Sequence, residues 1–249
     1  MTLFMHAFRP NMAQLVRLAA RERLLPPGDD LGYALHVALT ATFAETAPKP
    51  FVWCPPGTPS GGTTGRLLSY SSTSLDTLRE RAASAADPAF AAVLDLSCAA
   101  SKEMPTRFDT GKRFAFRVRV RPVLRTGKKR DGSGGKERDA YLDSPDDAGG
   151  RVTRGDCYLA WLAERLGAGG AHLEKGRLES FQLTRLMTRD RSGEKSRRDA
   201  PTGPDAIATG TLIVSEPDAF ASLLGRGIGR FRAFGFGMLL LAPGTPTEN

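Results

Sequence analysis

Histidine is the side chain best suited to proton transfer near neutral pH, and the sequence contains three of them. His6 lies in a short apolar run, where we expect a packed strand residue, and His172 follows a glycine-rich loop, where we expect the surface. His36 lies in an apolar segment that carries leucines at helical spacing. At roughly 100° per residue, Tyr33 and His36 fall on one helix face, one turn apart and away from the leucine stripe. This pair is the candidate catalytic site.

The chemistry open to such a pair is the cleavage of RNA by its own 2′-hydroxyl group. That reaction needs a base, an acid and electrostatic help for the phosphorane, but no metal ion. A histidine beside a tyrosine also occurs for purely structural reasons, and the residue types alone leave both alternatives open. The sequence has no cluster of His, Cys, Asp or Glu at ligand spacing, so we expect no metal and no cofactor. It also lacks the Gly-x-Ser-x-Gly motif and an evident Cys–His pair.

A glycine-rich stretch over 225–237 interleaves glycines with arginines and phenylalanines, and no acid occurs between Asp218 and Glu248. Glycine accepts positive φ, so successive N–H groups of such a loop can form an anion-binding concavity. The alternative is a glycine-rich turn before a buried terminal strand at 238–241. The stretch fits neither the Walker loop nor the dinucleotide fingerprint. The residues of this stretch that we expect to bind RNA are Gly227, Gly229, Arg230, Arg232, Gly235 and Gly237.

Two other segments are basic. Apolar and basic residues alternate over 114–121, which predicts a strand with one apolar and one basic face. A polar segment over 189–204 has the composition of a hairpin tip. Such charges often form only a solvated surface, and the scarcity of aromatics argues against base stacking, so we favour recognition of shape and phosphates. The predicted RNA-binding residues here are Arg117, Arg119 and Arg121 on the strand, and Arg185, Arg189, Arg191, Lys195, Arg197 and Arg198 about the hairpin.

Length, charge and cysteine content limit the number of domains, the class of partner and the compartment that we expect. The chain has 249 residues, enough for one large domain or two ordinary ones, and a formal net charge of +8. That charge favours a polyanionic partner. Three widely spaced cysteines without a CxxC motif indicate a reducing compartment. No apolar stretch approaches the roughly 20 residues of a membrane span. We therefore expect a cytoplasmic protein with no membrane partner.

The order of elements predicts an α+β fold. Each half of the sequence offers strands, a helix, strands, a helix and a strand, which fits two tandem ferredoxin-like (βαββαβ, RRM-like) units. We expect an N-terminal unit over 1–126, which carries the catalytic helix and includes the strand near 114–124. A basic, glycine-rich connector over 127–150 follows. The C-terminal unit over 151–249 carries the basic hairpin and the glycine-rich loop.

Four segments resemble the CasE family, the CRISPR repeat-processing endoribonucleases of type I-E Cascade. They occur in the family's order and span nearly the whole chain. The glycine tail is the most specific of them. The segments are Asp30-Leu-Gly-Tyr33-Ala-Leu-His36, Phe116-Arg-Val-Arg-Val-Arg-Pro122, Tyr158-Leu-Ala-Trp161-Leu, and Gly227-Ile-Gly229 followed after five residues by Gly235-Phe-Gly237-Met-Leu-Leu-Leu-Ala-Pro243.

This resemblance implies two ferredoxin-like domains and metal-independent cleavage at the 3′ base of a repeat stem-loop. It places the catalytic tyrosine and histidine of the family at Tyr33 and His36. The 2′-hydroxyl would attack the adjacent phosphate, leaving a cyclic phosphate and a 5′-hydroxyl. A basic hairpin would enter the RNA groove. The implied partners are the CRISPR repeat stem-loop, the mature guide RNA and the other Cascade subunits, chiefly the adjacent backbone subunit.

One departure from the family bears on the chemistry. Some members have a lysine on the catalytic helix beyond the histidine, whereas this helix has Val37, Ala41 and Ala44 there and no lysine before Lys49. Charge neutralisation must come from elsewhere, or the rate is low. A non-catalytic RNA-binding scaffold of the same fold is therefore an alternative. A small-molecule-binding ferredoxin-like enzyme is a second alternative, which the excess of arginine over acid argues against.

Overall fold

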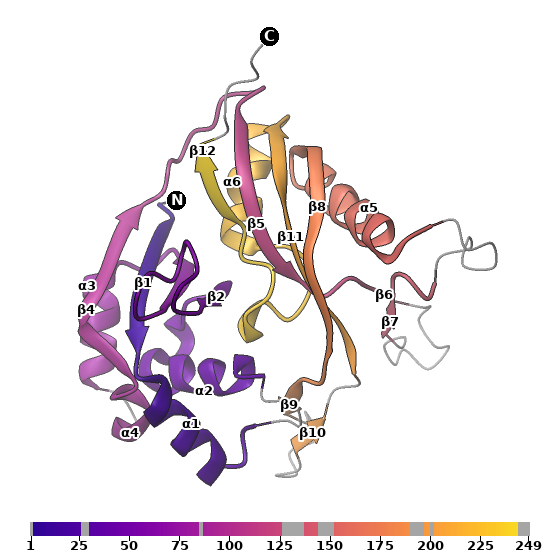
Figure 1. Cartoon of the computed structure of the whole chain (residues 1–249). Coiled ribbons are helices and arrows are strands. Elements are labelled where there is room, and N and C mark those ends of the chain that lie inside the picture. Colours follow the sequence, from indigo (N-terminus) through magenta and orange to yellow (C-terminus); the bar gives the residue numbers. More distant parts are fainter. Residues whose placement is uncertain are drawn as a thin grey trace, which may run out of the picture.

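The computed structural model describes residues 2–25, 30–84, 87–125, 137–143, 152–189, 197–199 and 202–243, with the side chains of 187–189 and 197–199 left out. Two four-stranded antiparallel sheets form its framework, each covered by helices on its outer face (Figure 1). Within this described part of the chain, no helix is both long enough and apolar enough to cross a membrane.

The first sheet is built entirely from the N-terminal half, with the strand order β2-β3-β1-β4 and all neighbours antiparallel. Two strand–helix–strand crossovers joined by a hairpin produce this order, as in a ferredoxin-like unit. Its elements are β1 (Phe4–Pro10), α1 (Met12–Arg21), α2 (Gly32–Phe43), η1 (Ala44–Thr46), β2 (Phe51–Cys54), β3 (Arg66–Ser71), α3 (Leu75–Ala83), α4 (Pro88–Ala91) and β4 (Leu94–Glu103).

Helix α2 is the central helix of this half. Its predicted apolar stripe is buried: Leu35 and Leu39 are each 1 % exposed, and Phe43 is fully buried. They pack with Phe8 of β1 and Phe51 of β2 in one core. Full burial of an aliphatic or aromatic side chain contributes about 1.5–3 kcal/mol, so this stripe fixes the rotation of α2 about its axis. The opposite face, which carries His36, is thereby directed away from the centre of the core.

The second sheet has the strand order β12-β5-β11-β8. If the four strands of each sheet are numbered in chain order, both sheets have the same strand order. The tandem ferredoxin-like fold predicted from the sequence is therefore present. The elements of this half are β5 (Arg113–Val120), β6 (Val123–Arg125), β7 (Glu137–Asp139), α5 (Arg154–Gly167), β8 (Ala171–Thr184), β9 (Met187–Arg189), β10 (Arg197–Asp199), β11 (Gly203–Val214), α6 (Pro217–Arg226), η3 (Arg232–Phe234) and β12 (Leu240–Pro243).

The expected placement of the strand near 114–124 in an N-terminal unit ending at residue 126 is wrong. Strand β5 pairs with β11 along its whole length and with β12 on its other side, so it is the first strand of the second sheet. Its apolar face, with Val118 1 % and Val120 2 % exposed, packs into the core beneath α5 and α6. The chain passes from one sheet to the other at 104–112. Of the connector expected over 127–150, the structure describes only 137–143.

The inner faces of the two halves meet over a smaller apolar cluster. Val52, Tyr70 and Met104 of the first half pack there with Met238, which follows the glycine-rich stretch. The Tyr70 hydroxyl donates a hydrogen bond to the Leu239 carbonyl at 3.0 Å. The glycine-rich stretch therefore runs between the halves, alongside α2 (Figure 1).

Candidate active site between the two halves

The N-terminus of α2 is held by an acid that precedes it. The Asp30 carboxylate accepts a hydrogen bond from the Gly32 backbone N–H at 2.9 Å. A side chain at position 32 would collide with the Phe234 carbonyl of η3, so only glycine fits there. The helix that carries the candidate pair is thus packed directly against the glycine-rich loop.

Tyr33 and His36 lie together as the helical spacing predicts, with ring centroids 6.2 Å apart. The Phe234 ring lies against both: its centroid is 5.9 Å from Tyr33 and 5.0 Å from His36, the latter in an edge-to-face arrangement. The two features that the sequence offered separately, the helix pair and the glycine-rich stretch, therefore form one site. Phe234 belongs to that stretch but was not singled out in the sequence.

The environment of His36 favours its neutral form. Partial burial, and then the positive charge of Lys49, lower the pKa of the His36 imidazole from its usual value of 6.5. The Thr40 hydroxyl lies 3.5 Å from Nδ1 on the next turn. At neutral pH the imidazole is mostly unprotonated and can accept a proton. Tyr33, at 8 % exposure, is the more deeply buried member of the pair.

The glycines allow the two ends of the loop to come close together. Gly237 has φ +77°, and a Cβ there would strike the Ile228 carbonyl, while the Ile228 N–H donates to the Gly237 carbonyl at 2.8 Å. Within the loop so closed, Arg230 pairs with Glu137 at 2.7 Å, and Arg232 donates to the Arg226 carbonyl at 2.7 Å. Both arginines are thereby held in place along the loop.

A cavity of about 650 Å³ opens between this loop and the end of η1. Its lining contains cations, aromatic rings and glycine backbone but no acid. Because Phe234 lines the cavity and also contacts His36, the cavity adjoins the candidate pair. Its composition suits an anion such as a phosphodiester. The lining residues are Lys49, Gly225, Arg226, Gly229, Arg230, Phe231, Arg232, Ala233 and Phe234.

A buried ion-pair network ties the helix to the second sheet. Arg119 on β5 lies 2.6 Å from the Asp30 carboxylate and 2.6 Å from that of Asp205 on β11. Gln182 donates a further hydrogen bond to Asp205, and the Arg119 guanidinium stacks over the Phe236 ring at 4.2 Å. Burial alone would lower the pKa of Arg119, but hydrogen bonds and charge from Asp205 and Asp30 raise it overall. The network joins the start of α2, the glycine-rich loop and the second sheet.

The fold agrees with the comparisons to known proteins. A family model described as "CRISPR associated protein" matches residues 5–243. The chain belongs to this CRISPR-associated family. A search of curated protein sequences found no match.

Solved structures of CRISPR proteins share the fold over nearly their whole length. Thermus thermophilus Cse3 bound to an RNA representing a pre-cleavage complex is 20% identical, with a TM-score of 0.59, over 98% of this chain and 100% of that one. The CRISPR endoribonuclease Cse3 bound to a 19-nucleotide RNA is 22% identical, with the same TM-score and coverage. Cas6e from Escherichia coli str. K-12 is 18% identical, with a TM-score of 0.53 and the same coverage. The predicted resemblance is confirmed for family and fold.

In this CRISPR-associated chain, the arginines of the basic face predicted over 114–121 have partners within the protein. Arg119 is in the network above, and Arg121 is 2 % exposed and donates to Thr184. Arg117 pairs with Glu179 at 3.0 Å. Acids and carbonyls from β8 and β11 thus meet these guanidinium groups. RNA contact by the three arginines stays a prediction, which this geometry does not favour.

The basic hairpin is described only in part. Strands β9 and β10 pair antiparallel, with Arg197 opposite Arg189, and Arg185 is exposed just before β9. Arg191 and Lys195 lie outside the described residues. RNA binding by the hairpin residues, Arg198 included, stays a prediction, as does RNA binding by the loop glycines.

The other two histidines lie where the sequence predicts. His6 is fully buried in β1, with Nε2 3.0 Å from the Thr73 carbonyl, and burial lowers its pKa. His172 is exposed on β8. Among the residues that the structure describes, no group of three His, Cys, Asp or Glu side chains is placed to hold a metal ion.

Replacing Tyr33 by phenylalanine should slow RNA cleavage by less than the replacement of His36. The ring keeps its contacts with Phe234, and only the hydroxyl is lost. A single neutral hydrogen bond is worth about 0.5–1.5 kcal/mol, so we expect a decrease of about tenfold or less. The single-turnover cleavage rate measures this, and an unchanged rate would remove the hydroxyl from the mechanism.

Replacing Arg119 by alanine should destabilise the protein by about 3–5 kcal/mol, because it leaves Asp205 buried, charged and unpaired. Release of Asp30 should also reduce cleavage, since Asp30 holds the start of α2. Arg117→Ala is the matched control, since its pair with Glu179 is partly exposed and worth at most about 1 kcal/mol. Urea unfolding and single-turnover rates test this, and equal stability losses in the two variants would refute the assignment.

Proposed function

We propose that this chain is a metal-independent endoribonuclease that cleaves precursor CRISPR RNA at the 3′ base of the repeat stem-loop. It then stays bound to the mature guide RNA in the cytoplasm as a Cascade subunit, beside the backbone subunit. The observation that carries the proposal is the contact of Phe234 with Tyr33 and His36 at the edge of a cationic cavity. Family membership and the fold shared with RNA-bound Cse3 support it. So does the fold shared with a chain of a CRISPR RNA-guided surveillance complex, at 18% identity and a TM-score of 0.52.

In the proposed reaction, the neutral His36 imidazole accepts the proton of the 2′-hydroxyl beside the scissile phosphate. The 2′-oxygen forms a bond to phosphorus as the bond from phosphorus to the 5′-oxygen breaks. A proton is returned to the leaving 5′-oxygen, so the products are a cyclic phosphate and a 5′-hydroxyl. Tyr33 positions the 2′-hydroxyl or the phosphate, and the cations of the cavity oppose the charge that develops on the phosphorane.

The proposal is tested with the purified protein and a transcript of the repeat from its own CRISPR array, in the presence of EDTA. We expect one cut at the 3′ base of the stem, with the ends named above. Tight, salt-dependent binding of the hairpin without any cut would instead support the non-catalytic scaffold. Absence of hairpin binding would exclude both functions and leave the small-molecule alternative.

The cleavage rate should depend on pH through His36 in a defined direction. Its pKa is lowered from 6.5 by burial and by Lys49, and a base is active only when deprotonated. We therefore expect the rate to decrease as the solution is acidified, with the midpoint of the decrease below pH 6.5. Single-turnover rates across this range measure it. A rate that climbs steadily as the solution is acidified would assign His36 as the acid.

A further inference from the structure

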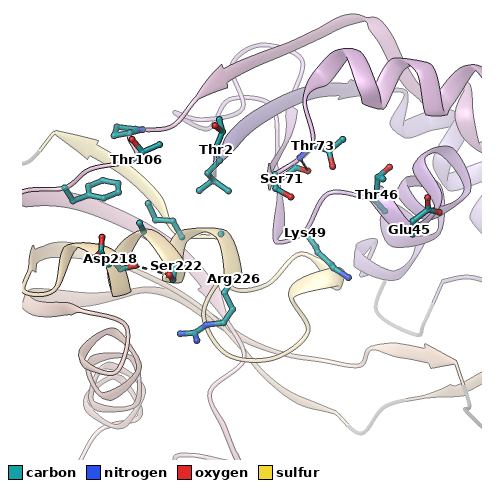
Figure 2. A pocket seen from close by; sticks show the side chains of 18 residues that line it. Thr2, Glu45, Thr46, Lys49, Ser71, Thr73, Thr106, Asp218, Ser222 and Arg226 are labelled. Atoms are coloured by element: carbon teal, nitrogen blue, oxygen red, sulfur yellow. Dashed lines mark hydrogen bonds between the residues drawn. The ribbon is translucent and has the colours of Figure 1, made fainter.

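Lys49 occupies a particular position between the halves. It follows η1, precedes β2, and has an exposed side chain. It lines the cationic cavity described above and also a second cavity of about 610 Å³, rich in serine and threonine. Figure 2 shows the Lys49 side chain at the edge of this second cavity, extending toward the glycine-rich loop, while Arg226 leaves α6 in another direction. Lys49 thus stands where the two cavities join.

Within the described part of the chain, the Lys49 ammonium group has no ion-pair partner. Of the other cations around the cationic cavity, Arg230 pairs with Glu137, Arg232 is bound to a backbone carbonyl, and Arg226 points in another direction from Lys49. Among the residues that the structure describes, no acid lies within 4.0 Å of the Lys49 ammonium. The lining of the cationic cavity has no acid at all. An anion in this cavity would therefore find an uncompensated positive charge at Lys49.

Lys49 is also close enough to His36 to act on it. Phe234 lines the cavity together with Lys49. Its ring contacts the His36 ring edge to face, with the two centroids 5.0 Å apart. The charge of Lys49 contributes to the lowered pKa of His36. Of the cations that line the cavity, Lys49 alone comes from the half of the chain that carries the catalytic pair. A phosphate seated against Phe234 would share the cavity with Lys49 and lie against the ring that contacts His36.

We infer that Lys49 supplies the positive charge that stabilises the scissile phosphate as the 2′-oxygen attacks. This inference rests on the proposed function. As the phosphorane forms, negative charge accumulates on its non-bridging oxygens, and a preplaced ammonium at the wall of the cavity opposes it. Lys49 neither takes nor gives the transferred proton, which moves between the 2′-oxygen, His36 and the leaving oxygen. Its contribution should therefore fall on the rate of cleavage more than on affinity.

The test compares Lys49→Ala, Lys49→Arg and the control Lys102→Ala, an exposed lysine on β4 that lines neither cavity. Single-turnover cleavage of the repeat hairpin should fall about 100-fold in Lys49→Ala, recover in large part in Lys49→Arg, and stay unchanged in the control. Affinity for an uncleavable hairpin with a 2′-deoxy nucleotide before the scissile phosphate should change by less than about threefold. An NMR titration should show the pKa of His36 raised in Lys49→Ala alone.

The outcomes separate the inference from the proposed function. If the wild type and Lys49→Ala cleave the hairpin at the same rate, the role of Lys49 is overturned, but the proposed endoribonuclease function is not. A loss of affinity that equals the loss of rate would make Lys49 a general phosphate anchor, which also overturns the inference. A wild-type protein that binds the hairpin and does not cut it refutes the proposed function, and the role of Lys49 with it.

Discussion

Replacing His36 by alanine should abolish detectable cleavage of the repeat hairpin while its affinity stays within about threefold of the wild type. Proton transfer by a positioned side chain contributes about 10²–10⁴-fold to a rate, and His36 is the histidine that lies beside the cationic cavity. Affinity for RNA comes instead from many phosphate contacts spread over the surface. Single-turnover rates and hairpin binding at one fixed salt concentration measure the two effects separately.

The matched control is His172→Ala, because His172 is exposed on β8, in the other half of the chain. It should cleave at the wild-type rate. If His36→Ala lost binding and thermal stability together with cleavage, His36 would be a packing residue of α2 and not a catalytic one. If it cleaved like the wild type, the candidate site would be misplaced.

Ending the chain after Gly237 should unfold the second sheet. This deletion removes Met238 and Leu239, which are 1 % and 0 % exposed, together with all of β12. Loss of a buried leucine or methionine side chain costs about 2–5 kcal/mol even when the backbone remains. The hydrogen bond from Tyr70 to the Leu239 carbonyl and the pairing of β12 with β5 are lost as well. Together these losses match the whole stability of a typical domain, about 5–15 kcal/mol.

Circular dichroism and a thermal scan measure this effect. A chain that ends at Pro243 keeps β12 whole and is the control, which should melt like the full chain. We expect the shorter chain to lose a large part of its strand signal and its cooperative transition. A shorter chain with normal strand content and a normal melting temperature would mean that the terminal strand is an accessory to the sheet.

The sequence predicted local structure better than it predicted which strands pair in the sheets. Alternation over 114–121 correctly predicts β5 and its two faces, but periodicity does not say which strands lie beside it. Its neighbours, β11 and β12, come from the far end of the chain. For the same reason the partners of Arg119 were missed: Asp30 is 89 positions away and Asp205 is 86 positions away. On the basic face of β5, Arg119 is therefore held between two acids, while Arg117 forms a partly exposed pair with Glu179.

For the candidate site, too, the sequence predicted the local contact and missed the contact between the two halves. Tyr33 and His36 meet because a helix places residues three apart on one face, which spacing alone predicts. The contact with Phe234 depends on how the two halves pack, and no local pattern encodes it. Lys49 was noted in the sequence only as the first lysine beyond the helix. Its place at the cavity depends on the path of the segment after η1, which lies beside the glycine-rich loop.

The central claim is that a 2′-hydroxyl attacks a phosphate held beside His36 without a metal ion. The most direct test is single-turnover cleavage, in EDTA, of two repeat hairpins that differ only in the 2′-hydroxyl before the scissile phosphate. We predict that the all-RNA hairpin is cut to a cyclic phosphate and a 5′-hydroxyl, and that the 2′-deoxy hairpin binds equally well and remains intact. Cleavage of the 2′-deoxy hairpin, or cleavage of the all-RNA hairpin only when a divalent metal is added, would contradict the account.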